Sequence, residues 1–394
     1  MRYLFVTVDS AGALYPQLAL AQRVRSRGHD VRFLACRSQR GPIAQAGFRV
    51  RSYEGPPDFD MTGRDGAIRD WADDPETAFD ACCEHIWFGP ASAVAADVLA
   101  DVRREPVDGI VIDYFAYGAA AAAERLGLPM VVLWHTAFGE WPVFNRGLPA
   151  LNTARTGLGL REAADVYEPY HRAERILVLT TECFDYALGR PRVPGNLRHV
   201  GPQFPPGQEP LAVRPVGTRQ TPRVLVSLST SYQAQEDLLT RIVAALADLP
   251  VKALVTTGPA VTLDGTAPAN VEIRAWANHT EVLPNTDLVV THAGLGTVMT
   301  AMAFGVPLLC VPMGRDQGGN AERVVQLGFG IAAEPSDGID ELRRSISTAV
   351  ANAELRSRAI ELAEECTRGE GYDAGAVELE VARSETGFSK ERSE

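Results

Sequence analysis

Short apolar runs alternate with segments of helical spacing along the first half of the chain. The segments at 16–28 and 119–127 repeat apolar residues with a helical period. Strands that are apolar along their whole length are typical of a parallel sheet covered on both faces. The pattern therefore predicts an N-terminal, Rossmann-like α/β domain over residues 1–205. Its expected strands are 2–8, 30–36, 108–114, 130–135 and 175–180.

The alternation stops in a stretch rich in proline and glycine at 200–223 and then resumes. Such a stretch is typical of a linker, which we place at 206–222. A second Rossmann-like domain is predicted over 223–375, followed by a C-terminal helix and tail at 376–394. The predicted fold class is α/β, with two parallel sheets facing a cleft. The expected strands of the second sheet are 224–229, 251–257, 271–276, 287–292 and 307–312.

Composition narrows the classes of partner. The formal net charge of -12 argues against a nucleic-acid partner, which needs a basic face. No apolar run approaches the roughly 20 residues of a membrane span. The six cysteines lack the spacing of a structural metal site, so we expect no metal and reduced thiols in a cytoplasmic protein. Small molecules are the expected partners, and the sequence leaves a homodimer open.

The stretch THAGLGTVMTAMAFGVP at 291–307 places two glycines and a threonine at the start of a predicted helix. The first amides of a helix are unpaired and its dipole is positive there, so this segment suits a phosphate or diphosphate. A turn that needs small residues for packing is the alternative. The segment lacks the Gly-Lys-Ser/Thr of a Walker loop.

Neighbouring strand ends carry further candidates. Trp276 follows a strand, where an indole suits stacking on a nucleobase, and core packing is the alternative. Asp316, Gln317 and Asn320 follow another strand, and carboxylates and amides suit sugar hydroxyls. Capping of the next helix by Asp316 is the alternative for that residue.

The order of these residues resembles the donor-binding signature of family-1 nucleotide-sugar glycosyltransferases, and most closely their bacterial natural-product branch. The matching residues are Trp276, the segment 292–297, Gly305-Val306-Pro307, Asp316, Gln317 and Asn320. The resemblance implies the GT-B fold, with the donor bound by the C-terminal domain and the acceptor by the N-terminal one. It also implies inverting, metal-independent transfer to a hydrophobic or aromatic natural product, with the nucleotide-diphosphate sugar as co-substrate and no other cofactor.

The resemblance also implies a role for each donor-site residue. The residues implied for the base are Trp276 and His279, for the diphosphate Ser229, Thr230, His292, Gly294, Gly296 and Thr297, and for the sugar Asp316 and Gln317. Enzymes that use uridine diphosphate commonly have Glu where this chain has Thr300, and that Glu holds both ribose hydroxyls. A thymidine-diphosphate sugar is therefore favoured over a uridine-diphosphate sugar.

The general base is where this chain departs from the family. The usual motif Gly-His-x-x-Pro is matched by Gly12 and Pro16, but Ala13 stands at the histidine position and cannot accept a proton. Three residues at strand ends are candidates for the base, each with a purely structural alternative. They are Asp113, which matches the family's partner carboxylate, Asp9 and His135.

The N-terminal half is rich in aromatic residues, which suits a large apolar acceptor. The predicted acceptor-binding positions are Ala13, Trp71, Trp87, Phe138 and Trp141, with ordinary core packing as the alternative. Two other functions stay open at this point. The missing histidine fits a degenerate protein that assists a partner enzyme, and the GT-B architecture also occurs in nucleotide-sugar epimerases.

Overall fold

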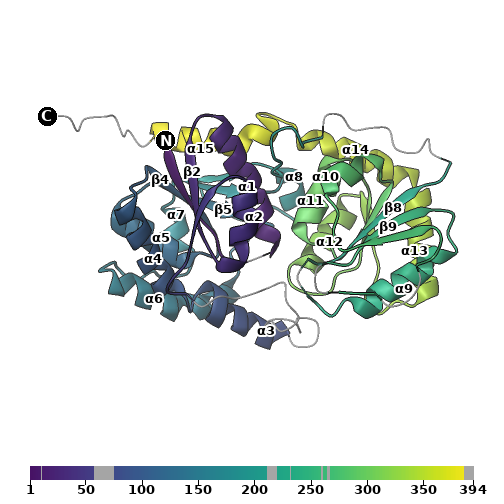
Figure 1. The fold of residues 1–394 in the computed structure, drawn as a ribbon, viewed down its shortest axis with the longest axis horizontal. Helices are drawn as coiled ribbons and strands as arrows, with labels where there is room; N and C mark the ends of the chain where they lie inside the picture. Colours follow the sequence, from purple (N-terminus) through teal and green to yellow (C-terminus); the bar gives the residue numbers. More distant parts are fainter. Residues whose placement is uncertain are drawn as a thin grey trace.

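The computed structural model describes residues 1–9, 11–56, 75–210, 220–230, 232–258, 261–263 and 267–385. Two parallel sheets lie side by side, with helices on both faces of each (Figure 1). This arrangement confirms the predicted fold class. The exact domain boundaries stay predictions, and Trp71 lies outside the described residues.

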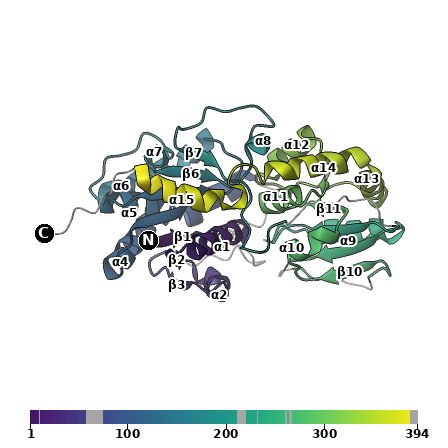
Figure 2. The ribbon, with the colours of Figure 1, turned by 90° about the horizontal axis from the view of Figure 1, so that it is seen from above.

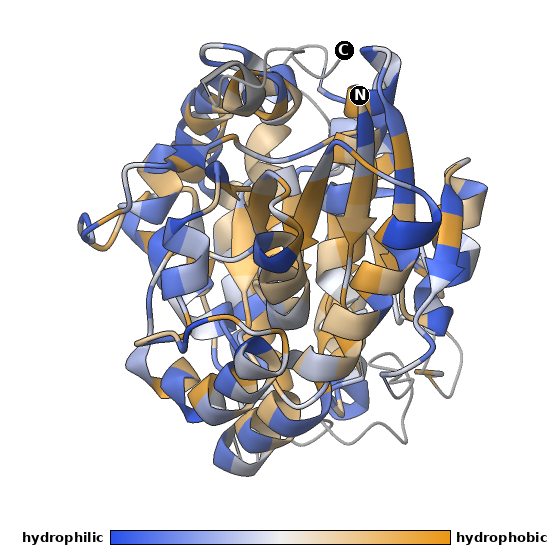
Figure 3. Ribbon diagram, turned by 90° about the vertical axis from the view of Figure 1, so that its left-hand side faces the viewer, coloured by the Kyte–Doolittle hydropathy of each residue, from blue (hydrophilic) through white to orange (hydrophobic). Residues whose placement is uncertain are grey.

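The N-terminal sheet has seven strands in the order β3-β2-β1-β4-β5-β6-β7, and every neighbouring pair is parallel. Side chains alternate between its faces, so Phe5 joins one core cluster and Val6 the other. Figure 3 shows these central strands as an apolar layer inside helices that are polar outside. The strands are β1 (Arg2–Val6), β2 (Asp30–Ala35), β3 (Arg49–Ser52), β4 (Gly109–Asp113), β5 (Met130–Trp134), β6 (Arg175–Val178) and β7 (Leu197–His199). The helices are α1 (Ala11–Ser26), α2 (Arg40–Gln45), α3 (Pro75–Cys82), α4 (Ala91–Arg104), α5 (Tyr117–Leu126), α6 (Leu148–Gly157), α7 (Glu168–His171) and α8 (Glu182–Asp185).

The C-terminal sheet has six parallel strands in the order β10-β9-β8-β11-β12-β13. Its two faces also carry separate apolar clusters. The strands are β8 (Arg223–Ser227), β9 (Lys252–Thr256), β10 (Val271–Arg274), β11 (Leu288–Thr291), β12 (Leu308–Cys310) and β13 (Gly330–Ala332). The helices are α9 (Glu236–Ala247), α10 (His279–Val282), α11 (Leu295–Ala303), α12 (Gln317–Gln326), α13 (Ile339–Ala351), α14 (Ala353–Glu365) and α15 (Ala374–Glu385).

The last two helices connect the domains. Helix α14 packs on α11, whereas α15 returns to the N-terminal domain and packs on α1 and β6 (Figures 1 and 2). The hydroxyl of Tyr3 donates to the carbonyl of Leu379 at 3.3 Å, and Arg175 pairs with Glu378 at 2.9 Å. The C-terminal helix is therefore part of the N-terminal domain's surface.

A second connection is centred on Arg23 of α1, which is 5% exposed. Its Nε donates to the carbonyl of Phe204, and its Nη1 pairs with Asp373 at 2.6 Å. The ring of Phe204 meets the ring of Tyr372 edge-on at 5.1 Å. One buried guanidinium thus ties helix α1 to the segment between the two sheets and to the turn before α15.

Helix α1 begins earlier than the sequence predicts. The expected helix was 16–28, preceded by a loop, because a proline lacks the N–H that a helix interior uses. The structure begins α1 at Ala11 and keeps Pro16 inside it. Ala13 therefore lies in the first turn of a helix rather than in a loop.

No helix among the described residues combines the length and apolar character needed to cross a membrane. Within the same residues, no group of three or more His, Cys, Asp or Glu side chains is arranged to hold a metal ion.

Candidate active site

Both sheets reverse their strand order between two neighbouring strands, β1 and β4 in the first and β8 and β11 in the second. Ligands of open parallel sheets bind beyond the carboxyl ends of the strands at such a point. Asp113 is the last residue of β4, and His292 directly follows β11. The predicted residues of both domains therefore lie where this topology places ligands.

The two sets of strand ends also approach each other. Burial raises the pKa of the Cys82 thiol to about 12, and the charge of Arg315 from the other domain opposes that shift. The phenol of Tyr114 is likewise affected by the charge of Asp316. These interactions connect the ends of α3 and β4 with the loop after β12.

Asp113 and His135 form a pair in the N-terminal domain. Asp113 is completely buried, and its Oδ2 lies 3.1 Å from Nε2 of His135, whose side chain is 8% exposed. His135 directly follows β5, the neighbour of β4, so adjacent strands bring the two residues together. The other ring nitrogen, Nδ1, has no hydrogen bond to any described residue. The pair is thus a histidine oriented by a carboxylate with one nitrogen left for a substrate.

Two further groups hold the Asp113 carboxylate. Its Oδ2 accepts from Nε2 of Gln17 at 2.6 Å, and its Oδ1 accepts from the backbone N–H of Phe115 at 2.9 Å. Both oxygens of the carboxylate thus accept hydrogen bonds from the protein. Asp9, the third predicted candidate, instead accepts from Ser38 at 2.8 Å.

An aromatic cluster adjoins this pair through Phe115. Trp87 stacks on Phe115 with centroids 4.4 Å apart and an interplanar angle of 9°, and Phe115 meets His135 edge-on at 5.6 Å. Half-buried Trp87 is thus separated from the imidazole of His135 by the ring of Phe115. The cluster consists of Phe79, Trp87, Phe115, Trp141 and Phe144.

A π-helical turn at Cys83–Trp87 positions Trp87. Such turns are rare and occur frequently at functional sites, because the extra residue re-aims the side chains that follow. The backbone packs closely here, since a Cβ at Gly89 would lie 1.7 Å from the carbonyl oxygen of Glu84. The backbone around Trp87 is therefore tightly packed against the preceding turn.

Two of the predicted acceptor-binding residues are buried in the structure. Phe138 is 4% exposed and packs on Trp134 at 4.9 Å, so its ring belongs to the core. Ala13 is 1% exposed and offers no surface to an acceptor. Phe138 was predicted from its position after a strand, which does not show which way a side chain points, and Ala13 from its place at the histidine position of the family motif. Trp141 is 39% exposed and stays a candidate together with Trp87.

In the C-terminal domain, the loop after β11 has an unusual backbone. Ala293 has a φ of 65°, a left-handed conformation that is costly for a residue with a Cβ. Gly294 is needed next to it, because a Cβ there would lie 2.5 Å from Nε2 of His292. Burial, with the nearby charge of Arg315, lowers the pKa of His292 to about 3. The imidazole is therefore neutral at pH 7.

Space is open at the start of helix α11. A Cβ built on Gly296 meets no heavy atom within 4 Å, and Gly296 is exposed. Half-buried Thr297 follows it in the first turn. Thr300 turns its hydroxyl back to the carbonyl of Gly296 at 2.6 Å. Unpaired helix amides thus border an open space, as an anion site requires.

The predicted base-binding residues lie close by in the chain. Trp276 is 65% exposed, an unusual state for the largest apolar side chain and one that suits a stacking surface. Nε2 of His279 lies 3.1 Å from the hydroxyl of Ser227, and burial lowers its pKa. His279 is thus turned toward the end of β8, whereas Trp276 faces solvent.

Buried side-chain amides connect the loops around this space. Asn320, which is 1% exposed, donates from Nδ2 to the carbonyl of Ala293 at 3.0 Å and to Asp316 at 2.9 Å. Gln317, at 2% exposure, accepts from the backbone N–H of Met313 and donates to Gln233. Exposed Asp316 is therefore oriented by Asn320 and makes no capping hydrogen bond.

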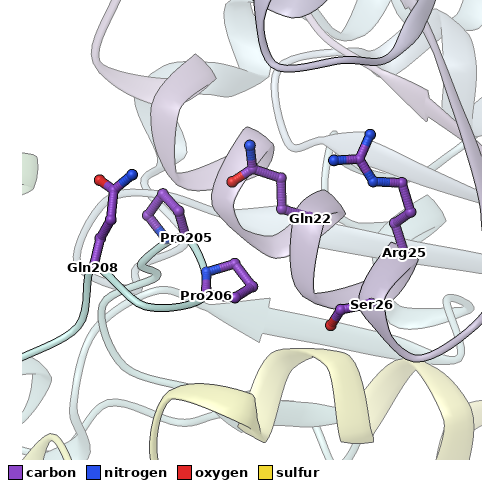
Figure 4. Close-up of a pocket in the computed structure, with 6 residues that line it drawn as sticks. All are labelled: Gln22, Arg25, Ser26, Pro205, Pro206 and Gln208. Atoms are coloured by element: carbon purple, nitrogen blue, oxygen red, sulfur yellow. The ribbon is translucent and has the colours of Figure 1, made fainter.

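A hollow of about 520 Å³ lies elsewhere, between α1 and the segment after β7. Figure 4 shows its lining side chains, and none of them is a predicted site residue. We therefore do not connect this hollow with the active site. Its lining residues are Gln22, Arg25, Ser26, Pro205, Pro206 and Gln208.

Comparisons with known proteins agree with the geometry. Residues 240–369 match the family described as "Erythromycin biosynthesis protein CIII-like, C-terminal domain". The 4'-demethylrebeccamycin synthase of Lentzea aerocolonigenes is 28% identical over 92% of this chain and 95% of its own length. The chain is a glycosyltransferase of the bacterial natural-product type.

Solved structures share the fold of this glycosyltransferase over nearly its full length. The calicheamicin glycosyltransferase CalG4 matches with a TM-score of 0.78 and 22% identity, over 98% of this chain and 99% of that one. The spinosyn rhamnosyltransferase SpnG in complex with thymidine diphosphate matches with a TM-score of 0.68 and 20% identity, over 97% and 100%. At this identity the likeness shows the GT-B fold alone.

Several site residues of this glycosyltransferase were not predicted from its sequence. Gln17 and Gln233 lie inside polar or helical stretches where glutamine is ordinary, and their role depends on long-range hydrogen bonds. The π-helical turn has no sequence signal that we recognise. Asn320 was noted in the family signature, but its contact with Ala293 requires the packing of two loops.

Proposed function

We propose that this glycosyltransferase moves a sugar from a thymidine-diphosphate sugar to a hydrophobic, aromatic acceptor, with inversion at the anomeric carbon. The observation that carries the proposal is the Asp113–His135 pair under the aromatic cluster. It supplies a general base in a chain whose family position for that base, Ala13, cannot accept a proton. The hypothesis of a degenerate partner protein loses its main support when another histidine is paired with the same carboxylate.

In the proposed step, Nε2–H of His135 donates to Asp113, and Nδ1 accepts the proton of the attacking acceptor hydroxyl or amine. The acceptor atom forms a bond to the anomeric carbon while the bond from that carbon to the diphosphate oxygen breaks. The electron pair of the broken bond leaves with the diphosphate. A single displacement of this kind inverts the anomeric configuration. Asp113 stabilises the imidazolium that forms.

The departing diphosphate is stabilised by the protein without a metal in this proposal. The unpaired amides at the start of α11, next to Gly296, and the hydroxyl of Thr297 face an increasing negative charge. His292 contributes as a neutral hydrogen-bonding group, because its pKa of about 3 leaves it uncharged at pH 7. Exposed Thr230, three residues after the end of β8, is a further proposed contact of the diphosphate.

Two observations support a thymidine donor. Thr300 has no carboxylate to accept from a ribose 2′-hydroxyl, and its own hydroxyl already donates to the carbonyl of Gly296. A spinosyn rhamnosyltransferase of the same fold is known in complex with thymidine diphosphate. Trp276, with 65% of its surface exposed, is the proposed stacking surface for the base.

The base assignment is tested by His135→Ala. We expect kcat to fall by about 10²- to 10⁴-fold, the usual contribution of a general base, while thymidine-diphosphate affinity stays unchanged. The measurement is single-turnover transfer from a thymidine-diphosphate sugar to a panel of phenols and aromatic amines. His199→Ala is the control, because His199 forms a similar pair with Asp185 at 2.7 Å away from the aromatic cluster.

Three results would contradict the proposal. A fully active His135→Ala variant would remove the base assignment. Thymidine-diphosphate binding without transfer to any acceptor would favour a partner protein. An epimerised sugar formed from the donor alone would favour an epimerase.

A further inference from the structure

A chain of buried hydrogen bonds runs between the two predicted ends of the donor, the diphosphate and the sugar. Ser229 lies two residues after the end of β8, where the diphosphate is expected. Gln317 is the first residue of α12, where the sugar is expected. Gln233 lies between them, and the side chains of all three are more than nine-tenths buried. Gln317 donates to Gln233 at 3.0 Å, and Gln233 donates to Oγ of Ser229 at 2.6 Å.

The direction of this chain is set by the backbone. The N–H of Met313 can only donate, and it lies 2.7 Å from the Gln317 amide, so Oε1 of Gln317 must be the atom that accepts. Nε2 of Gln317 then donates to Gln233, which must present Oε1. Nε2 of Gln233 in turn donates to Ser229, whose oxygen must accept. One backbone amide thus fixes the orientation of both glutamines.

This direction leaves hydrogen-bond donors at both ends. Because Oγ of Ser229 accepts from Gln233, its own hydrogen must point elsewhere, and none of the described residues accepts it. Gln317 uses one hydrogen of Nε2 on Gln233 and keeps the second. Phosphate oxygens and sugar oxygens are the groups that such hydrogens suit.

We propose that Gln233 is a positioning residue of the donor site that couples its two ends. This proposal rests on the proposed function, because it assumes a nucleotide-diphosphate sugar in this site. Gln233 touches neither end of the donor but holds Ser229 as a hydrogen-bond donor to the diphosphate and Gln317 as a donor to the sugar. Hydrogen bonds in a chain strengthen one another, so a change at Gln317 reaches Ser229 through Gln233.

The backbone between Ser229 and Gln233 is held by Gln235 rather than by the side chain of Gln233. A positioning role of the Gln233 side chain can therefore be tested apart from a role in holding the loop. Gln235, at 2% exposure, accepts from the backbone N–H of Gln233 and donates to the carbonyl of Ser229. These two hydrogen bonds fix the backbone of the segment without the side chain of Gln233. Replacing that side chain therefore removes the coupling and leaves the loop anchored.

The test uses thymidine diphosphate, which lacks the sugar that is transferred. Gln317→Met removes the amide at the end that binds the transferred sugar, and we expect it to weaken thymidine-diphosphate binding about five-fold or more, although that sugar is absent from the ligand. In the Gln233→Met background the same substitution should have no further effect. Calorimetric dissociation constants of the four proteins form a double-mutant cycle around Gln233 and Gln317.

Asn270→Ala is the control for general destabilisation. Asn270 directly precedes β10, at the amino end of the strands, whereas the donor site lies at their carboxyl ends. It donates to the carbonyls of Leu246 and Leu249, so its loss should lower the unfolding midpoint and leave thymidine-diphosphate affinity unchanged. If Gln233→Met fails to fold, the effect of Gln317→Met on thymidine diphosphate still decides the matter.

The outcomes separate this inference from the proposed function. Normal thymidine-diphosphate binding by Gln317→Met, or an equal loss in both backgrounds, overturns the coupling and leaves the proposed function intact. A wild-type protein that binds no thymidine or uridine diphosphate overturns both.

Discussion

The space around Asp113 is shared by residues that come from different elements. Gln17 reaches it from α1, and His135 reaches it from the end of β5. Ala13 lies one helical turn before Gln17 and therefore on the same face of α1. A small residue at position 13 leaves the carboxylate to Gln17 and His135, so the departure from the family pattern and the His135 pair belong together.

Restoring the family residue should fail for this reason. Ala13 is 1% exposed, so Ala13→His inserts a larger polar ring into a filled space. We expect a loss of about 1–3 kcal/mol in the free energy of unfolding and no increase in kcat. Urea unfolding and single-turnover transfer measure the two quantities. A stable variant with faster transfer would show that the site still has room for the family's histidine.

Element-scale features explain what the sequence could and could not predict. The apolar runs predicted the parallel strands, and the strand ends pointed to Asp113 and His135 as candidates. Their contact was not predicted, because it depends on β4 and β5 being neighbours. The burial of Phe138 was not predicted, because the direction of a side chain after a strand depends on the loop that follows.

The start of α11 gives a prediction in which stability and binding change in opposite directions. Gly296→Ala should raise the free energy of unfolding by up to about 1 kcal/mol, because alanine favours a helix and the new Cβ meets no atom. The same methyl should weaken thymidine-diphosphate binding, because it occupies the space proposed for the phosphate. Thermal unfolding and calorimetry on one preparation measure both effects.

Gly294→Ala is the matched control for that element. Its Cβ would lie 2.5 Å from the His292 ring, so we expect losses of both stability and binding. If Gly296→Ala binds thymidine diphosphate as tightly as the wild type, the phosphate lies elsewhere and the two glycines serve packing.

At the scale of the whole molecule, the two domains have separate cores but share buried connections. Arg23→Met removes the guanidinium that holds Phe204 and Asp373, and we expect a loss of about 1–3 kcal/mol. We expect scanning calorimetry to resolve two unfolding transitions in the variant and one in the wild type.

Arg146→Met controls for the loss of an arginine. Its ion pairs with Glu76 and Asp80 are exposed, so the free energy of unfolding should stay close to that of the wild type. A single, unshifted transition in Arg23→Met would show that the domains are held together by other contacts.

The return of α15 to the first domain has a consequence for how the chain folds during its synthesis. The strands of the N-terminal sheet are synthesised first. The apolar surface that packs against Ala376 and Leu379 of α15 is left uncovered until residues 374–385 have emerged from the ribosome. Domains usually fold as units in the order of synthesis. Here the N-terminal domain is synthesised first but completes its core only when α15 is added. A nascent chain stalled before residue 374 should therefore expose this apolar surface to chaperones.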